Sequence, residues 1–385
     1  MSTLIDDVRY LAETIGPRGT GTSSEAAAAE FVGKRLNEYG YKPEIHVFKT
    51  VPSQNAFPIA ISVLTLIAAA VFPLGVVVSN WLAVILSIGA GWSLWQTIRN
   101  DPINPLTMAL SKVPSQNVEV CVNPQGKVEK RVVILAHLDS NRCRLVWQSL
   151  SVKSLGPMTW LTLAVPIGMG LLYLCGTITR NLLWWWISLP FVAYEIGAII
   201  TLIRDDRTPF SPGAHDNAAS IAVAIEVAKR ISNNPLNNTE TWFVFDGAEE
   251  TDHGGTIDFL RRHGWRLREA VFIGLEGLGS GEIVYLTRQG VCAYYRPHPS
   301  LLKLTQMVSA DHPELDFRPA QMIAEDDVRT LTVRGYRAIC FAGRDPETGI
   351  LPRWHRIDDT YDSVSEKTML RASEILHAVL KEIDS

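Results

Sequence analysis

Five short polar motifs in this chain carry side chains that can bind metal ions or transfer protons. His137 and Asp139 follow an apolar strand pattern at residues 132–136. The His-x-Asp spacing points both side chains to one face of an extended chain, so Asp139 can orient the imidazole of His137. The other motifs supply Asp216, the adjacent acids Glu249 and Glu250, Glu276, and His355.

Most of these motifs have an ordinary explanation when taken alone. Asp216 precedes an Ala-rich helix pattern and could be its N-cap. Adjacent acids such as Glu249 and Glu250 commonly answer the helix dipole in solvent. Glu276 ends an apolar strand pattern, where an acid is unusual. The combination indicates a site, because imidazoles and carboxylates at strand ends and in loops suit two zinc ions.

The order and local sequence of the motifs resemble the di-zinc aminopeptidase and glutamate carboxypeptidase family of metallopeptidases. The likeness extends to Gly16-Pro-Arg-Gly and to residues 326–343, so it covers the chain outside its apolar stretches. The matching segments are Val-Ile-Leu-Ala-His137-Leu-Asp139-Ser, Gly-Ala-His-Asp216-Asn-Ala-Ala-Ser, Phe-Asp-Gly-Ala-Glu249-Glu250, Gly-Leu-Glu276-Gly and Trp-His355-Arg-Ile-Asp-Asp-Thr360-Tyr-Asp362.

This resemblance implies a ligand set for two zinc ions per chain. Asp216 would bridge the two ions. His137 and Glu276 would complete the site of one ion, and Glu250 and His355 would complete the site of the other. Glu276 stands where the family commonly has Asp, which gives that ligand a longer reach.

The resemblance also implies a catalytic assignment. Glu249 would be the general base that takes a proton from a metal-held water as the water attacks the peptide carbonyl. Asp139 would support the first imidazole ligand, and the bond between Asp216 and Asn217 would be a cis peptide. The expected activity is exopeptidase hydrolysis, in first place by an aminopeptidase.

Two alternatives stay open at this point. Trp354-His355 and the Asp-Gly before the acidic pair also resemble glutaminyl cyclases, which are acyltransferases that bind a single zinc. A receptor or scaffold that keeps the peptidase fold without turnover belongs to a different class of protein. The number of zinc ions per chain discriminates between the aminopeptidase and the glutaminyl cyclase. The absence of bound metal would favour the scaffold.

The patterns around the motifs predict an α/β fold. Strands alternate with helices, which predicts a three-layer sandwich with a mixed, centrally parallel sheet between helices. Open α/β sheets bind ligands at the carboxyl ends of their strands, where several of the motifs lie. The expected strands cover 44–50, 117–122, 132–137, 241–246, 271–276, 282–286 and 338–341, and the expected helices cover 4–13, 24–39, 217–231, 256–263, 300–309, 327–333 and 364–383.

Four apolar stretches predict transmembrane helices. They cover residues 57–78, 81–98, 157–176 and 182–203, each near the roughly 20 residues that cross a hydrocarbon core. The links at 79–80 and 177–181 are short, so each pair returns to the side from which it entered. We expect hairpin 1 at 57–98 and hairpin 2 at 157–203, inserted in one soluble peptidase domain made of 1–56, 99–156 and 204–385. Glu195 within the fourth stretch predicts a polar partner or a water cavity.

Basic residues predict the orientation of the hairpins. The only basic residue in the short loops opposite the soluble domain is Arg180. The positive-inside rule therefore places the soluble domain and both termini in the cytoplasm. Residues 1–10 lack a long apolar run, so we expect no cleavable signal. Five widely spaced cysteines indicate free thiols in a reducing compartment. The basic residues on the soluble side are Lys42, Lys49, Arg99, Lys112, Arg142, Arg144, Lys153, Arg204 and Arg207.

Charge and location narrow the partners. A net charge of -4 and a pI near 6.2 argue against a nucleic-acid partner, because phosphate neutralisation needs a basic face. The expected partners are a peptide substrate, hydrophobic by virtue of the membrane location, and the lipid bilayer. An aminopeptidase needs an acid near the metals for the substrate ammonium, and a carboxypeptidase needs an arginine. Asp326 is the candidate acid for an aminopeptidase, and Arg344 is the candidate arginine for a carboxypeptidase.

Overall fold

The computed structural model describes residues 3–98, 105–144 and 154–385. The chain forms two compact units. The first contains Met1–Pro52, Lys112–Ser149 and Pro209–Ser385, and the second contains Ser53–Ser111 and Leu150–Thr208. Arg99, Lys153 and the predicted start of a soluble segment at residue 99 lie outside the described residues.

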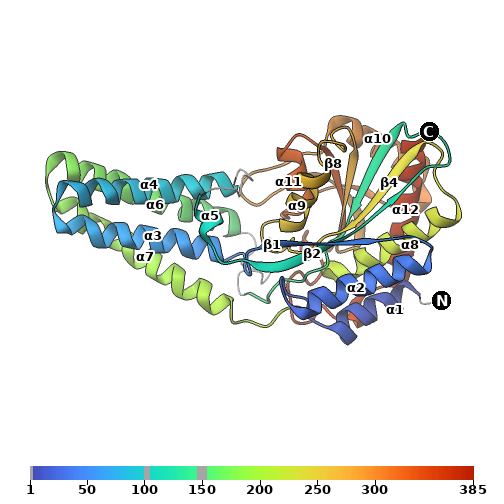
Figure 1. Cartoon of the computed structure of the whole chain (residues 1–385), viewed down its shortest axis with the longest axis horizontal. Helices are drawn as coiled ribbons and strands as arrows, with labels where there is room; N and C mark the ends of the chain where they lie inside the picture. Colours follow the sequence, from blue (N-terminus) through green and yellow to red (C-terminus); the bar gives the residue numbers. More distant parts are fainter. Residues whose placement is uncertain (1–2, 99–104, 145–153) are drawn as a thin grey trace. The chain divides into compact units, whose positions relative to one another are not determined.

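The first unit is built around an eight-stranded mixed sheet (Figure 1). The strand order is β1-β2-β4-β3-β5-β8-β6-β7. The four neighbours β4, β3, β5 and β8 are parallel, whereas β1, β2 and β6 pair antiparallel with at least one neighbour. The strands are β1 (Glu44–Thr50), β2 (Val113–Val122), β3 (Lys130–Leu135), β4 (Thr239–Phe245), β5 (Val271–Glu276), β6 (Glu282–Gln289), β7 (Arg318–Met322) and β8 (Arg337–Arg344).

Helices cover both faces of this sheet, which confirms the predicted mixed α/β fold (Figure 1). Alternate strand residues such as Val132, Ile134 and Ile273 point to one face, where they form a buried core with the first helical layer. That layer contains α1 (Leu4–Arg9), its π-helical continuation Tyr10–Ile15, α2 (Ser23–Glu38), α8 (Ser220–Asn233), α10 (Pro299–Asp311) and α12 (Glu366–Asp384). The second layer contains α9 (Gly254–His263) and α11 (Asp327–Val333).

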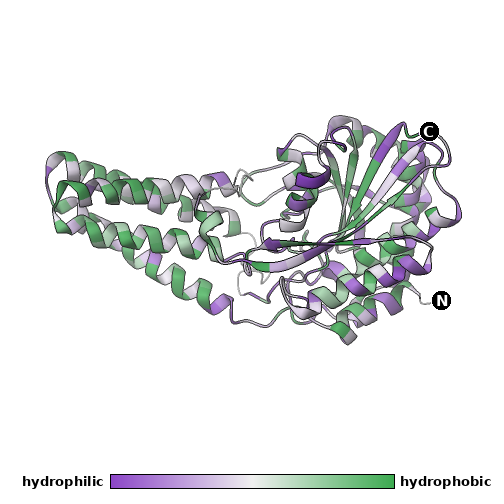
Figure 2. Ribbon diagram, in the orientation of Figure 1, coloured by the Kyte–Doolittle hydropathy of each residue, from purple (hydrophilic) through white to green (hydrophobic). Residues whose placement is uncertain are grey.

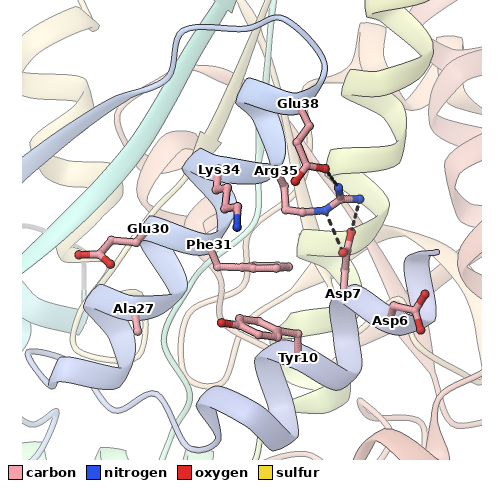
Figure 3. A pocket seen from close by; sticks show the side chains of 9 residues that line it. All are labelled: Asp6, Asp7, Tyr10, Ala27, Glu30, Phe31, Lys34, Arg35 and Glu38. Atoms are coloured by element: carbon pink, nitrogen blue, oxygen red, sulfur yellow. Dashed lines mark hydrogen bonds and ion pairs between the residues drawn. The ribbon is translucent and has the colours of Figure 1, made fainter. Parts of the chain in front are cut away.

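A groove of about 570 Å³ separates α1 from α2 in the first unit (Figure 3). The rings of Tyr10 and Phe31 stack there with centroids 4.6 Å apart. Nε of Arg35 donates to Asp7 at 2.9 Å, so an ion pair joins the two helices. Because α1 also contacts the short π-helix Ala214–Ala219, these contacts help to fix the turn that carries Asp216.

The second unit contains four helices that are long and apolar enough to cross a membrane, judged by length and composition. Most residues of these helices are hydrophobic (Figure 2). Close packing of α4 on α6 uses glycine: a Cβ at Gly91 would lie 2.5 Å from Ile167. Glu195 is buried on α7. The helices are α3 (Ala56–Val71) with its 3₁₀ extension Phe72–Leu74, α4 (Val77–Ile98), the short α5 (Pro105–Ala109), α6 (Leu155–Thr179) and α7 (Leu183–Asp205).

The turn of the first hairpin differs from the predicted link at residues 79–80. Pro73 cannot donate a helical hydrogen bond, so α3 gives way to the 3₁₀ turn, and Gly75 reverses the chain at φ +69°. Ser79 and Asn80 instead lie in the first turns of α4. In the second hairpin, α6 extends to Thr179, and Arg180 turns the chain in the left-handed region at φ +53°.

Candidate metal centre

The parallel strands bring the predicted site residues to one edge of the sheet. His137 follows β3, Glu276 ends β5, and the acidic pair Glu249 and Glu250 follows β4. Carboxyl ends of neighbouring parallel strands meet at the same edge, so these side chains converge. The short π-helix before α8 supplies Asp216, and the loop after β8 supplies His355.

His137, Asp216 and Glu276 form the first group of possible metal ligands. Nε2 of His137 lies 3.1 Å from Oδ1 of Asp216 and 3.5 Å from Oε2 of Glu276. Nδ1 of His137 lies 3.0 Å from the backbone carbonyl of Asp139. A carbonyl oxygen can only accept, so Nδ1 carries the proton in this contact, and in the neutral ring Nε2 keeps the lone pair that a metal ion needs.

Asp216, Glu250 and His355 form the second group. Nε2 of His355 lies 3.1 Å from Oδ2 of Asp216 and 3.1 Å from Oε1 of Glu250. Asp216 therefore presents one carboxylate oxygen to each group. The peptide bond between Asp216 and Asn217 is cis, as the resemblance implies.

The separations between these donor atoms fit zinc. In a tetrahedral site with bonds of about 2.0–2.1 Å, neighbouring donors lie roughly 3.3 Å apart. The four imidazole–carboxylate separations in the two groups are 3.1, 3.5, 3.1 and 3.1 Å. Imidazole nitrogen and carboxylate oxygen are also ordinary zinc donors. The residues present therefore fit two zinc ions that share one aspartate.

Asp139 fixes the backbone of the acidic pair. Its carboxylate accepts hydrogen bonds from the backbone N–H groups of Glu249 at 3.1 Å and Glu250 at 3.3 Å, and from the hydroxyl of Thr20 at 2.7 Å. The same carboxylate lies 3.6 Å from Nδ1 of His137. Asp139 therefore links the loop after β3 to the loop after β4.

Two further side chains orient ligands, although no sequence pattern singled them out for this. Asp359 accepts from the backbone N–H groups of His215 at 2.8 Å and Asp216 at 3.2 Å. Nδ2 of Asn141 donates to Oε2 of Glu250 at 2.6 Å. Asn141 follows the His-x-Asp motif by two residues, a position at which an amide has no distinctive sequence signal.

Buried charges compensate one another in both groups. Burial by itself lowers the pKa of each imidazole, but the surrounding carboxylates outweigh it. Glu276 and Asp216 raise the pKa of His137 well above its ordinary value, and Glu250 and Asp216 raise the pKa of His355 to about 9. The two imidazoles lower the pKa of Asp216 despite its burial. Zinc bound at the groups would replace the positive charge of these protons.

Glu249 lies beside the ligands. Donor atoms of His137, Glu249 and Glu250 lie within 4.8 Å of one another. Burial raises the pKa of Glu249 to about 8, although His137 and His253 oppose the rise. A buried carboxyl with such a pKa is suited to accept and return a proton near neutral pH.

The two predicted substrate-binding residues have partners within the fold. Oδ1 of Asp326 accepts from Nε2 of Gln289 at 2.7 Å and from the backbone N–H of Val328 at 2.9 Å, where it caps α11. Arg344 lies 3.4 Å from Glu282. Neither residue belongs to a group of possible ligands within the described ranges. Recognition of substrate termini by Asp326 and Arg344 stays a prediction.

One further histidine reaches the site without a sequence signal. His253 contacts Glu249 and also Asp327, which lies 74 positions further along the chain. A lone histidine three residues after an acidic pair has no pattern that predicts such a contact.

Comparisons with known proteins point to one family. Residues 205–380 match the model of Peptidase family M28, a segment that contains Asp216 and His355 but not His137. Endoplasmic reticulum metallopeptidase 1 of Mus musculus is 29% identical over 197 residues, which are 48% of this chain and 20% of the relative. Aminopeptidase YwaD of Bacillus subtilis is 26% identical over 194 residues, 46% of this chain and 39% of the relative. The chain thus spans well under half the length of these curated relatives.

Solved structures show the same fold. BSAP, a zinc aminopeptidase from Bacillus subtilis, is 14% identical with a TM-score of 0.56, and the match covers 99% of this chain and 94% of that protein. A glutaminyl cyclase from Bacteroides thetaiotaomicron, bound to N-acetylhistamine, is 14% identical with a TM-score of 0.57, covering 98% and 96%. The fold is shared by both enzymes, so it does not choose between them. The predicted resemblance to the zinc aminopeptidase-like metallopeptidases is confirmed, and residues 205–380 are similar to peptidase family M28.

Proposed function

We propose that the chain is a membrane-bound, zinc-dependent exopeptidase, most simply an aminopeptidase. The observation that carries the proposal is the pair of ligand groups that share Asp216, with the Glu249 carboxyl beside them. The match of residues 205–380 to a peptidase family supports a hydrolytic reaction on peptides.

The proposed ligands follow the two groups. His137, Asp216 and Glu276 would hold one zinc ion, and Asp216, Glu250 and His355 would hold the other. Zinc supplies Lewis-acid chemistry at such a site, since it polarises a carbonyl oxygen and lowers the pKa of water.

Glu249 is the proposed general base. Its buried carboxyl would take a proton from the attacking water and pass it to the leaving amine, a transfer that contributes roughly 10²- to 10⁴-fold to the rate. Asp139 would keep Glu249 and Glu250 in place through their backbone N–H groups, to which it is hydrogen bonded. Removal of the Asp139 carboxylate would therefore disturb both the base and a metal ligand.

A glutaminyl cyclase is the alternative that the fold permits. A single zinc ion would occupy only one of the two ligand groups. Both groups contain a buried imidazole that faces two carboxylates. This duplication favours two ions per chain and hence the peptidase.

The proposal includes an arrangement in the membrane. The two apolar hairpins would anchor a single peptidase domain, and the excess of basic residues on the domain side supports a cytoplasmic location for that domain. A membrane-impermeant thiol reagent applied to intact cells tests this. A cysteine introduced at Asn181 should react, and one introduced at Lys127 should react only after the cells are opened. The reverse pattern would contradict the orientation.

Peptide digestion tests the activity. Purified protein loaded with zinc should release amino acids from short peptides with a free N-terminus, and acetylation of that N-terminus should prevent the reaction. Chelation and Glu249→Gln should each abolish release, whereas Glu30→Gln, an exposed matched control on α2, should not. Digestion that survives both chelation and Glu249→Gln would refute the proposal, and release from acetylated peptides would refute an aminopeptidase.

A further inference from the structure

His253 is a buried histidine that the proposed reaction leaves without a function. It lies in the turn between β4 and α9 and is 5% exposed. Nδ1 of His253 lies 3.2 Å from Oε1 of Glu249 and 3.6 Å from Oδ1 of Asp327. A single ring nitrogen therefore faces both carboxylates.

The main chain of the turn ties the ring to Glu249 a second time. The backbone N–H of His253 donates to the carbonyl of Glu249 at 2.9 Å, and the N–H of Gly254 donates to the carbonyl of Ala248 at 2.8 Å. The residue that presents the ring is thus hydrogen bonded to the residue that the ring contacts. These two backbone hydrogen bonds restrict movement of His253 relative to Glu249.

The backbone at His253 is one that glycine would adopt more easily. Asp252 and His253 have φ values of +67° and +55°, in the left-handed region that disfavours side chains by roughly 1–2 kcal/mol per residue. Such conformations persist where surrounding contacts over-determine them. The contacts of the His253 ring with Glu249 and Asp327 are of this kind.

The titratable groups around His253 affect one another's pKa values. Burial by itself lowers the pKa of His253, but Asp327 and Glu249 outweigh it and raise that pKa well above its ordinary value. His253 and Asp246 hold the pKa of Asp327 low despite burial, while burial and Asp327 raise the pKa of Asp246 well above its usual range. A neutral Asp246 thus supports a charged Asp327, which faces the imidazolium.

We propose that His253, anchored by Asp327, is a positioning residue that holds the Glu249 carboxylate in the orientation from which it exchanges a proton with water. With Oε1 of Glu249 held at the imidazole, Oε2 is the oxygen left to take the proton. The inference rests on the proposed role of Glu249 as the general base.

A competing occupant of this position is a metal ion. Donor atoms of Glu249, His253 and Asp327 lie within 4.8 Å of one another, as they do in the two ligand groups. A metal at this position would occupy the Glu249 carboxylate and prevent its use as a base. Metal content therefore separates the two possibilities without any measurement of activity.

The test uses full-length, zinc-loaded protein and variants chosen for the backbone. His253→Gly removes the ring at a position where glycine is favoured, so the fold should survive. His253→Asn keeps an N–H donor near the place of Nδ1 and tolerates the left-handed region. Asp252→Gly is the matched control, because it places glycine at the adjacent residue in the left-handed region and keeps the His253 ring. Asp327→Asn removes the anchor and gives a second, independent variant.

Misplacing a reacting group by a fraction of an ångström to 1 Å lowers turnover by up to about 100-fold, so kcat of His253→Gly should fall about 10- to 100-fold. KM and zinc content should stay unchanged, Asp327→Asn should show the same split, and His253→Asn should restore most of the turnover. An unchanged kcat in His253→Gly, an equal loss in Asp252→Gly, or a loss of bound zinc would each overturn the inference. An inactive wild-type protein would instead refute the proposed function itself, and the inference with it.

Discussion

Asp216 and Asn217 connect the two ligand groups at the scale of single residues. The two oxygens of Asp216 face different imidazoles. The neighbouring Asn217 donates to the carbonyl of Leu275 at 2.9 Å and accepts from the N–H of Gly277 at 3.1 Å. These two bonds lie on either side of Glu276, so one dipeptide fixes the shared ligand and the end of β5 together.

The raised pKa of His355 predicts a pH-dependent affinity for zinc. Its pKa is about 9 in the metal-free protein, because Glu250 and Asp216 outweigh the effect of burial. Zinc must displace this proton, so its apparent affinity should increase by roughly tenfold per pH unit between pH 6.5 and 9 for each proton released. Competition titrations at several pH values measure this. An affinity independent of pH over that range would contradict the assigned protonation.

The same shift has a consequence for the stability of the metal-free protein. A folded-state pKa above the unfolded value of about 6.5 stabilises the fold fully below that value. This contribution is lost as the pH rises through about 9. Thermal unfolding of metal-free protein should therefore show a smaller difference between wild type and His355→Gln at pH 9.5 than at pH 6. His298→Gln, at an exposed histidine, is the matched control.

The sequence was sufficient to predict which residues converge, because each lies in a short motif at a strand end or in a polar loop. It was insufficient for the residues that orient them. Asn141, His253 and Asp359 act through contacts with residues far away in the chain, such as Glu250 and Asp327. Those contacts depend on how loops from different strands meet. The spacing of residues within one local segment of sequence does not predict them.

At the scale of elements, Asp384 fastens the last helix to the sheet. Its carboxylate at the end of α12 accepts from the backbone N–H groups of Asn237 at 2.7 Å and Asn238 at 2.8 Å, just before β4. Burial acts against ionisation, but these bonds outweigh it and lower the pKa of Asp384. The charged carboxylate therefore helps to place β4, which carries the acidic pair at its other end.

Asp384→Asn should lower the free energy of unfolding by about 1.5 kcal/mol at pH 7, since it removes the charge from two charge-assisted hydrogen bonds. A depressed pKa gives stability that is present above the unfolded pKa and is lost as the pH falls through the folded pKa. The difference between variant and wild type should thus shrink at pH values below about 3.9. Thermal unfolding across this range measures it, with Asp311→Asn on the exposed end of α10 as control. A difference that does not change with pH would contradict the charge-based explanation.

Elements were predictable where apolar residues recur with a strand or helix period. The patterns at 44–50, 271–276 and 327–333 coincide with β1, β5 and α11. β7 was missed, because Arg318–Met322 is a mostly exposed edge strand that contains a proline and has no apolar alternation. The first hairpin turn was misplaced because polar Ser79 and Asn80 suggested a loop, whereas Pro73 and Gly75 determine the turn.

At the scale of the whole molecule, the apolar surface of the second unit predicts membrane association. Large side chains such as Trp81, Ile85, Leu171 and Ile200 are exposed on its helices. Exposed apolar area costs about 25 cal/mol per Å² in water, so these helices need a hydrocarbon environment. The full chain should remain in the membrane fraction after an alkaline wash. A variant with short loops in place of Ser53–Ser111 and Leu150–Thr208 should appear in the soluble fraction, and a soluble wild-type chain would contradict the proposed anchor.

The number of zinc ions per chain tests the central claim most directly. Elemental analysis of purified protein should find two zinc ions in the wild type. It should find one in His137→Ala or in His355→Ala and none in Asp216→Asn, because Asp216 belongs to both groups. A wild type that holds a single zinc ion, which His137→Ala leaves in place, would contradict a shared two-zinc centre.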